Sequence, residues 1–432
     1  MGAPARETCS AKRLSSTRVP VVRARRVVWN LSASALLRIG DVLSKVNYFS
    51  FDDGFNGDVR GVAWPHELKV LIFGLAFNQP ITEVAWPASL EMLMFTGDFK
   101  HTLHGVSWPV SLQTLSFWGV DQSLVEISWP PSLHTLIFQG VIPNESIAGI
   151  SWPVSLKRLG LGRGFNQPID AGIAWPPSLT CLDLGADFNQ PIAAVNWPTS
   201  LTTLDLGFSF NQAIGLVTWP RSLQKLTLSC KFNQPIRGAQ WPASLQQLVF
   251  GDYFNQPIVG AWPPALEKLA FGRDFNQPIA KVAWPPSLQK LTFGGNFNQP
   301  IADASWPDSL QEISFTTERG EWLHNKKTCL IDLELYGLLC MSCFNQLITG
   351  VTWPPSLLKV TFGEYFDQSL VGVVWPAPLK ELAFSRDFSL PSESFEWPSS
   401  LEKLTIACRP NKPLPSWPGV QVCGVWSAYW DS

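Results

Sequence analysis

The stretch FNQPIVGAWPPALEKLAFGRD occupies Phe254 to Asp274, a length of 21 residues, and the chain then reads FNQPI again from Phe275. A sequence that returns to its own beginning at this interval is typical of a repeat array, in which one supersecondary unit is copied and stacked. The dipeptide Trp-Pro marks the period. It begins at Trp64, Trp86, Trp108, Trp129, Trp152, Trp175, Trp197, Trp219, Trp241, Trp262, Trp284, Trp306, Trp353, Trp375, Trp397 and Trp417, nearly always 21 to 23 residues apart.

Each unit reads WPxSLxxLxFGxxFNQPIxxVx, and the piece SLxxLxF predicts a β-strand. In the unit that contains Leu248 and Phe250, these two side chains share one face of an extended chain, while Gln247, Val249 and Gly251 point to the other face. A helix is excluded because the prolines of Trp-Pro and FNQPI leave no stretch long enough for three apolar helical turns.

A single strand of this kind cannot bury its apolar face, but identical units stacked in parallel can. Stacking pairs the backbone groups of each strand with the units above and below, and it joins the Leu, Phe, Ile, Val and Trp side chains into one core. The sequence therefore predicts a mainly β, parallel β-solenoid of about 16–17 coils of 22 residues, with few or no helices outside an N-terminal cap. At a strand spacing of roughly 4.8 Å, the stack would form a rod or shallow arc of roughly 80 Å.

One interval breaks the period. Trp306 and Trp353 are 47 residues apart, which is two periods plus three, and this predicts a coil that has lost its Trp-Pro. An irregular insertion is expected at residues 316–344.

The ends of the chain differ in composition from the repeats. Residues 1–28 hold seven Lys and Arg against one acid, which favours a solvated, disordered tail, although an organelle transit segment has the same composition. Residues 29–41 are expected to form an amphipathic cap, residues 42–420 the solenoid, and residues 421–432 a C-terminal tail or cap. Eight cysteines at irregular positions favour a reducing compartment and so a cytoplasmic location. No run of 18 apolar residues occurs, so no membrane span is expected.

An asparagine recurs at the same point of seven successive units. Its side chain can both donate and accept hydrogen bonds, and we expect it to satisfy turn backbone as a buried structural ladder. The ladder would comprise Asn166, Asn189, Asn211, Asn233, Asn255, Asn276 and Asn298. The tryptophans are likewise expected to form a stacked column at the corner of the coils.

These motifs resemble the FNIP repeat, a 22-residue relative of the leucine-rich repeat. FNQPI is intact at Phe77, Phe165, Phe188, Phe232, Phe254, Phe275 and Phe297, and the resemblance covers roughly residues 42 to 420. This chain departs from the family in having Trp-Pro where Leu-Pro is usual. The resemblance implies a leucine-rich-repeat-like solenoid used for protein contacts, sometimes attached to an F-box or a kinase, and neither attachment is visible here.

Catalysis is not expected, because translation by one coil copies like groups into columns, whereas an enzyme needs unlike groups in one place. No familiar nucleophile, nucleotide or metal-protease motif occurs, and we predict no cofactor. The best metal candidate would combine His324, Cys329, Cys340 and Cys343 as zinc ligands. Their spacing matches no familiar zinc finger, so a hydrophobic insertion with free cysteines is the favoured interpretation, and an imperfect gene model would give the same pattern.

The outward positions of the strands predict a partner-binding face, because their side chains change along the array. The first coils carry apolar residues, the middle carries acids and the last third carries spaced lysines. The predicted face comprises Val70, Ile72, Met92, Met94, Trp118, Ile137, Asp183, Asp205, Lys225, Lys268 and Lys290. An apolar patch beside a charged one favours a protein or peptide partner, so we expect a non-enzymatic interaction scaffold.

Two alternative functions are compared with this one, and the first of them stays open. Asn30 and Asn144 lie in glycosylation sequons and would suit an extracellular ligand-binding or adhesive ectodomain, although no secretory signal is apparent. The lysine column would suit nucleic acid, but the net charge of −2 and the intervening Glu312 and Glu381 argue against it. We therefore expect no nucleic-acid partner.

Overall fold

The structure is a computed structural model that describes residues 27–29, 46–316, 342–384, 388–389, 396–406 and 421–424. The described residues contain eighteen strands and no helix. The strands are β1 (Val27–Trp29), β2 (Tyr48–Phe51), β3 (Val70–Phe73), β4 (Met92–Phe99), β5 (Thr114–Val120), β6 (Thr135–Val141), β7 (Arg158–Arg163), β8 (Cys181–Asp183), β9 (Thr203–Asp205), β10 (Lys225–Thr227), β11 (Gln247–Val249), β12 (Lys268–Ala270), β13 (Lys290–Thr292), β14 (Glu312–Ser314), β15 (Lys359–Thr361), β16 (Glu381–Phe384), β17 (Lys403–Ile406) and β18 (Gln421–Gly424). Nothing in these ranges has the length and apolar character that a membrane-crossing helix requires.

Each strand pairs in parallel with the next strand along the chain, and equivalent residues stand opposite one another. Leu248 of β11, for example, lies between Leu226 of β10 and Leu269 of β12. Side chains alternate along the strands between buried and half-buried positions. The predicted parallel β-solenoid is confirmed.

The sheet extends beyond residues 42–420 at both ends. Val27–Trp29 pairs with β2, and Gln421–Gly424 pairs with β17, so each segment covers the backbone edge of a coil that would otherwise be open. The rest of the predicted tail, of the cap at residues 29–41 and of the segment 421–432 lies outside the described residues.

The prediction of a separate coil that has lost its Trp-Pro is wrong. β14 pairs directly with β15, with Glu312 opposite Lys359, and Phe344 stacks on Phe297 with the ring centroids 6.1 Å apart. Residues 312 and 359 are therefore equivalent positions of neighbouring coils, and the long interval is a single coil with extra chain. Within the predicted insertion, Thr316 and Phe344 belong to this coil, and residues 317–341 lie outside the described part.

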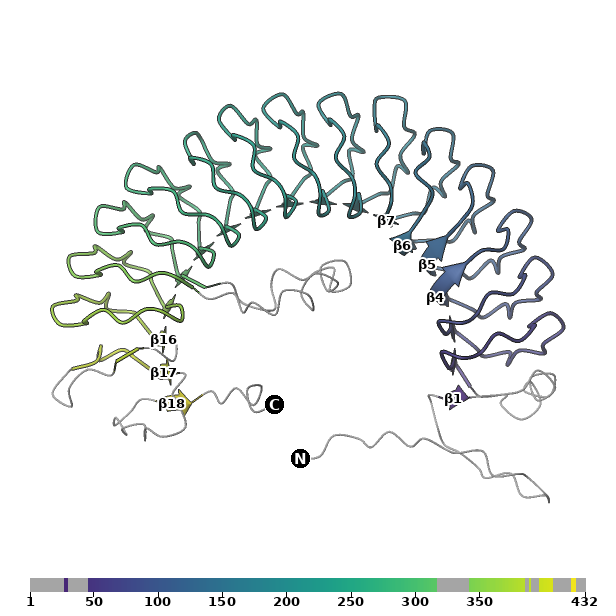
Figure 1. The fold of residues 1–432 in the computed structure, drawn as a ribbon, viewed down its shortest axis with the longest axis horizontal. Coiled ribbons are helices and arrows are strands. Elements are labelled where there is room, and N and C mark those ends of the chain that lie inside the picture. Colours follow the sequence, from purple (N-terminus) through teal and green to yellow (C-terminus); the bar gives the residue numbers. More distant parts are fainter. Residues whose placement is uncertain are drawn as a thin grey trace, which may run out of the picture.

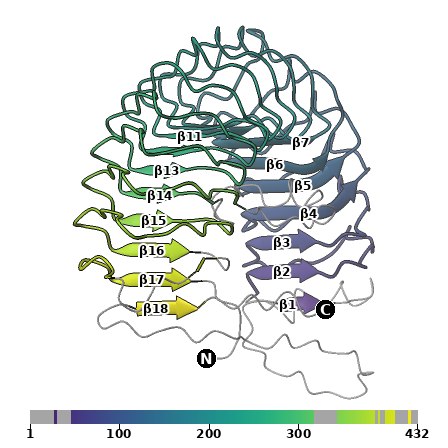
Figure 2. The same cartoon turned by 60° about the vertical axis from the view of Figure 1, so that its left-hand side comes forward.

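The solenoid is a strongly curved arc, with the strands on its concave side and the loops on its convex side (Figures 1 and 2). The prediction of a rod or shallow arc therefore underestimated the curvature. Parallel strands approach to about 4.8 Å, whereas the phenylalanines of the FNQ motif stack at 6.0 to 6.3 Å. Because the coils stand farther apart away from the strands, the stack bends.

Columns of identical side chains fill the interior. Leu248, Phe250 and Phe254 are fully buried, and their equivalents are buried in nearly every described coil. Phe254 stacks between Phe232 and Phe275 at 6.0 and 6.1 Å. The tryptophans form a second column at the edge of this core, with Trp262 and Trp284, for example, stacked at 6.4 Å.

Strands β4, β5 and β6 are seven or eight residues long, whereas β8 to β15 have three residues each. The position of a glycine differs between most of these coils. After most of the short strands a glycine such as Gly251 directly follows the buried Phe or Leu at the end of the strand, and a Cβ at Gly251 would lie 1.9 Å from the carbonyl oxygen of Ser229. Ser229 and Thr316 take this position after β10 and β14. In β4 the glycine comes one residue later, as Gly97, and Thr96 continues the strand. The concave sheet is wider over β4 to β6 than over β8 to β15.

Candidate interaction surface

The predicted apolar residues gather on the concave side of the widened region. Val70 stands opposite Met92, and Ile72 opposite Met94, in the register of β3 and β4. All four side chains are half-buried. Ile137 belongs to the same row but is two strands away from Met94, because Ser116 of β5 lies between them. The patch is therefore apolar over β3 and β4 and becomes mixed over β5 and β6.

Trp118 lies on the extension of β5 and leans across the neighbouring strand. A Cβ added to Gly140 of β6 would meet the Trp118 indole Nε1 at 2.9 Å and the Trp118 carbonyl oxygen at 2.6 Å. The side chain is half-buried. Because Gly140 has no side chain, it leaves the space that the Trp118 indole occupies. Sequence analysis missed this residue, although the shift from FG to FxG in this coil was a readable signal.

The two acids of the face accept hydrogen bonds from the turns that follow their own strands. Asp183 and Asp205 stand opposite one another on β8 and β9. Each accepts a hydrogen bond at 2.9 Å, Asp183 Oδ1 from the N–H of Gly185 and Asp205 Oδ1 from the N–H of Gly207. These carboxylates therefore stabilise the exit from the strand while they line the concave face.

Cys181 precedes this pair on β8 and is a free, half-buried thiol. Burial raises the pKa of the Cys181 thiol, and the negative charges of Asp183 and Asp205 raise it further, against the opposing effect of Arg158. A thiol with a raised pKa stays protonated at neutral pH and is a poor nucleophile. This column therefore offers no thiolate for covalent chemistry.

The lysines of the face alternate with acids from β13 onward, whereas Lys268 and Lys290 stand opposite one another on β12 and β13. Lys225, Lys268 and Lys290 occupy one column of β10, β12 and β13, and Lys290 Nζ lies 3.2 Å from Glu312 Oε2 on the next strand. Farther along, Lys403 lies 3.9 Å from Glu381. Phosphate backbones are bound by runs of cations that neutralise several phosphates together. Here the acids within the same column offset the lysines.

The repeated asparagines form a hydrogen-bonded ladder at the edge of the coil. The backbone N–H of each residue donates to the side-chain Oδ1 of the asparagine one coil earlier, as Asn211 does to Asn189 at 2.8 Å. The side chains are half-buried or, at Asn255, exposed, so the ladder is not the buried one that the sequence suggested. The ladder lies outside the phenylalanine column, which takes the interior position.

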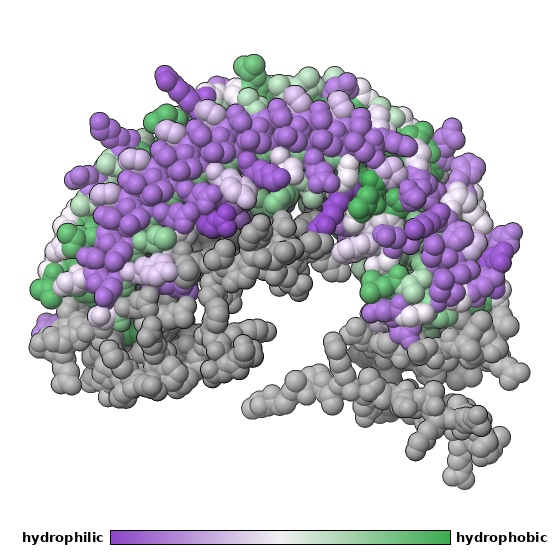
Figure 3. Space-filling view, in the orientation of Figure 1, coloured by the Kyte–Doolittle hydropathy of each residue, from purple (hydrophilic) through white to green (hydrophobic). Residues whose placement is uncertain are grey.

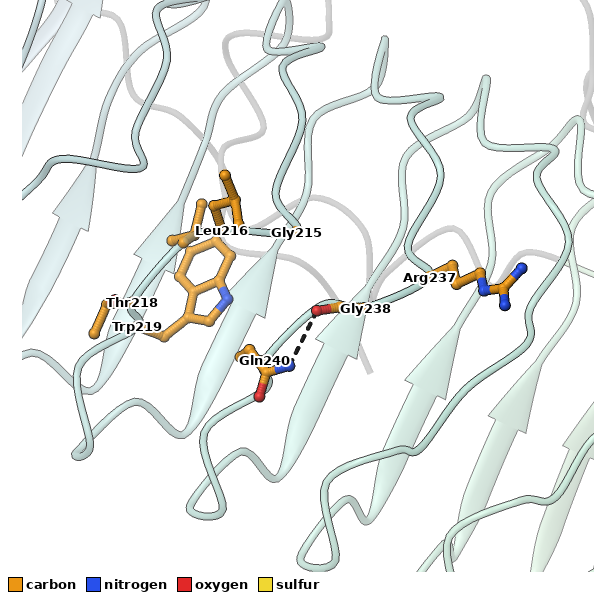
Figure 4. Close-up of a pocket in the computed structure, with 8 residues that line it drawn as sticks. Gly215, Leu216, Thr218, Trp219, Arg237, Gly238 and Gln240 are labelled. Atoms are coloured by element: carbon orange, nitrogen blue, oxygen red, sulfur yellow. Dashed lines mark hydrogen bonds between the residues drawn. The ribbon is translucent and has the colours of Figure 1, made fainter.

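A shallow hollow of about 680 Å³ lies on the loop segments away from the strands (Figure 4). Leu216, Trp219, Arg237 and Gln240 are among its lining residues, and Gln240 Nε2 donates to the carbonyl oxygen of Gly238 at 3.2 Å. Arg237 is the one ionisable side chain of this lining, so no general acid or base stands beside the Thr218 hydroxyl to activate it for hydrolytic or transfer chemistry.

The predicted metal ligands are not brought together by anything that the structure describes. His324, Cys329 and Cys340 lie outside the described residues, and Cys343 is a half-buried free thiol. Within the described ranges no cluster of three or more His, Cys, Asp or Glu side chains could hold a metal ion. Of the two sequons, Asn30 lies outside the description, while Asn144 is exposed and accepts the N–H of Asn166 at 2.8 Å.

Comparisons with known proteins agree with this architecture. The FNIP repeat family matches residues 165–209, 188–231, 232–274 and 275–317. A comparison with curated protein sequences finds no match. Among solved structures, the crystal structure of CroV588, described as a novel circular LRR protein, is similar at 31% identity with a TM-score of 0.70, over 91% of this chain and 57% of that one. This chain thus spans little more than half the length of that protein.

A second solved structure is the LRR protein LIC12759 of Leptospira interrogans. It is 16% identical with a TM-score of 0.51, over 88% of this chain and 93% of that chain. At this identity the likeness is one of fold.

Proposed function

We propose that this chain, an FNIP repeat protein with a leucine-rich-repeat-like fold, is a non-enzymatic scaffold that binds a protein or peptide along its concave strand face. One observation carries the proposal. Core positions repeat almost without change from coil to coil, whereas the concave positions change from apolar to acidic to alternating charge. A varied surface on a constant framework is what recognition of a specific partner requires.

The centre of the proposed site is the apolar patch over β3 and β4, together with Trp118. Wide strands, half-buried methionines and a seated indole supply adaptable apolar contact area, and such residues dominate binding energies at protein interfaces. The acidic pair Asp183 and Asp205 and the lysine column would then contribute orientation more than affinity. We expect this scaffold in the cytoplasm, a location that rests on cysteine usage.

The test compares two surface variants of the full chain. Met92→Asp/Met94→Asp places charge in the proposed site, while Val110→Asp/Val154→Asp adds the same two charges at exposed positions, 76% and 71% accessible, that follow Trp-Pro. Affinity capture identifies bound proteins, and the affinity of each purified candidate is then measured. The first variant is expected to weaken binding at least tenfold with an unchanged melting temperature, and the second to bind normally. Equal binding by both variants would contradict the proposal.

A further inference from the structure

The FNQ motifs place a second column of amides beside the asparagine ladder. From Asn189 to Gln299 each motif contributes one Asn and one Gln, and we call this set the amide stripe. Gln234 Nε2 donates to Asn211 Oδ1 at 3.1 Å, and Gln256 Nε2 donates to Asn233 Oδ1 at 3.0 Å. Each Asn Oδ1 therefore accepts from both the backbone and the glutamine of the following coil.

This bonding leaves one donor and one acceptor of every coil without a protein partner. Within the described residues no hydrogen bond involves the Nδ2 of these asparagines or the Oε1 of these glutamines. None of these atoms is among the buried atoms that lack a partner. They consequently face solvent, once per coil, and Figure 3 shows a hydrophilic band that follows the arc as such a column would.

The spacing of the stripe is close to that of an extended polypeptide. The phenylalanines immediately before these asparagines repeat at 6.0 to 6.3 Å. One edge of a β-strand presents an N–H and a C=O every second residue, about 6.4 to 6.8 Å apart. The mismatch is about 0.5 Å per coil, so it reaches about 2 Å over four coils, which flexible amide side chains can accommodate.

Apolar groups flank the stripe. The prolines that follow the glutamines are exposed, among them Pro191, Pro235 and Pro257. Tyr253, which precedes one of these motifs in the chain, is 45% exposed, and the Arg273 guanidinium lies 5.8 Å from the centre of its ring. A bound segment would thus find apolar contacts for its side chains beside hydrogen bonds for its backbone.

We propose that the amide stripe binds an extended polypeptide segment through its backbone. Each coil would donate an Asn Nδ2–H to a peptide carbonyl and accept a peptide N–H at a Gln Oε1. Because the contacts reach backbone groups, recognition would be largely independent of sequence. The register mismatch limits continuous contact to about four or five coils, which corresponds to about eight to ten residues.

The experiment uses fluorescein-labelled peptides of alternating threonine and alanine, with six, ten and sixteen residues, titrated with the full chain and followed by anisotropy. Affinity is expected to rise from six to ten residues and to change less than twofold from ten to sixteen. A decapeptide N-methylated at every third residue blocks amides on both edges of the strand, and it is expected to bind at least tenfold more weakly. Binding that N-methylation leaves unchanged would overturn the proposal.

Matched variants locate the site. Gln212→Leu/Gln234→Leu/Gln256→Leu removes three successive acceptors of the stripe, and Gln224→Leu/Gln246→Leu/Gln289→Leu makes the same change at exposed glutamines that precede strands. The first variant is expected to lose at least tenfold in affinity for the decapeptide and the second to retain it. Because the first variant also loses the Nε2–Oδ1 hydrogen bonds of the ladder, binding is compared at a temperature at which circular dichroism shows both variants fully folded. No saturable binding by the parent, or equal binding by the two variants, would refute the assignment, as would binding of a linear oligosaccharide and not of the peptide.

Discussion

The coils of β4 to β6 and those of β8 to β13 follow one backbone plan but expose different surfaces. In the second group the strand has three residues, a buried Phe or Leu and then a glycine (Ser229 after β10) follow it, and FNQ continues the amide ladder. In the first group the glycine is displaced by one residue, the strand runs on, and the ladder is interrupted. Gln122 replaces it by accepting the Leu103 N–H at 2.8 Å and donating to the His101 carbonyl at 2.7 Å. Departures from the repeat thus begin at β4, within the apolar concave patch over β3 and β4 where we propose that a partner binds.

The largest expected effect concerns the core that both groups share. Phe254→Ala removes a fully buried ring stacked on both sides and should destabilise its region by about 3–5 kcal/mol. Val120, the buried residue that follows the strand glycine in the coil of β5, has a smaller side chain, so Val120→Ala should cost less. Urea denaturation of both variants measures the difference. Equal losses would mean that the two groups do not differ in how their cores are built.

Glycine substitutions test whether the backbone that follows the strands is packed differently in the two groups of coils, as the structure indicates. A Cβ at Gly272 would lie 2.1 Å from the Gly251 carbonyl oxygen, so Gly272→Ala forces backbone to move and should cost about 1–3 kcal/mol. In Gly140→Ala the nearest atom is the Trp118 carbonyl oxygen, at 2.6 Å, and the next two belong to the Trp118 side chain, which can rotate, whereas all three atoms nearest Gly272 are backbone and lie at 2.1 to 2.6 Å. Gly140→Ala should therefore lose less stability but reduce partner binding. Thermal melts and affinity measurements separate the two outcomes.

The ladder and its replacement can be compared directly. Asn233→Ala leaves the N–H of Asn255 and the amide of Gln256 without their acceptor and should cost about 1–3 kcal/mol. Asn233→Asp should be nearly neutral, because Asp367 already occupies this ladder position and accepts the Ser389 N–H at 2.7 Å. Gln122→Ala should resemble Asn233→Ala in denaturation. A harmless Gln122→Ala would show that the irregular coils need no ladder.

The smallest expected effect is a gain in stability. Glu126 has φ of 69°, a left-handed conformation that costs a non-glycine residue about 1 kcal/mol, and Gly105 and Gly149 occupy the same turn in the neighbouring coils with φ of 77° and 86°. Glu126→Gly should therefore raise the unfolding midpoint. The equivalent turn residue Glu83 has no positive φ. Glu83→Gly should consequently lower the midpoint, and a loss in both variants would remove the evidence for strain in the irregular coil.

Most of the architecture could be predicted because its causes are local. The Trp-Pro period and the alternation around Leu248 and Phe250 specify a strand that must stack on its copies. The curvature could not be predicted, since it depends on the unequal spacing of the strand and phenylalanine columns across a whole coil. The direct pairing of β14 with β15 could not be predicted either, because the interval of 47 residues also fits two periods.

The candidate site was predictable in composition more than in arrangement. Alternation placed Met92 and Met94 on the concave side, but the seat of Trp118 on Gly140 depends on side chains from two strands. The turn-capping role of Asp183 and Asp205 likewise depends on a local backbone geometry that spacing does not reveal. The role of the FNQ glutamines could not be predicted, because the motif does not reveal which amide atoms are used in hydrogen bonds between coils.

The direct pairing of β14 and β15 has a practical consequence. Residues 316 and 342 leave and rejoin one coil while the sheet on either side keeps its register. The entropic cost of a surface insertion grows only slowly with its length. A fluorescent reporter or an affinity tag could therefore be inserted at this point of the array without changing the pairing of the strands in the rest of the arc.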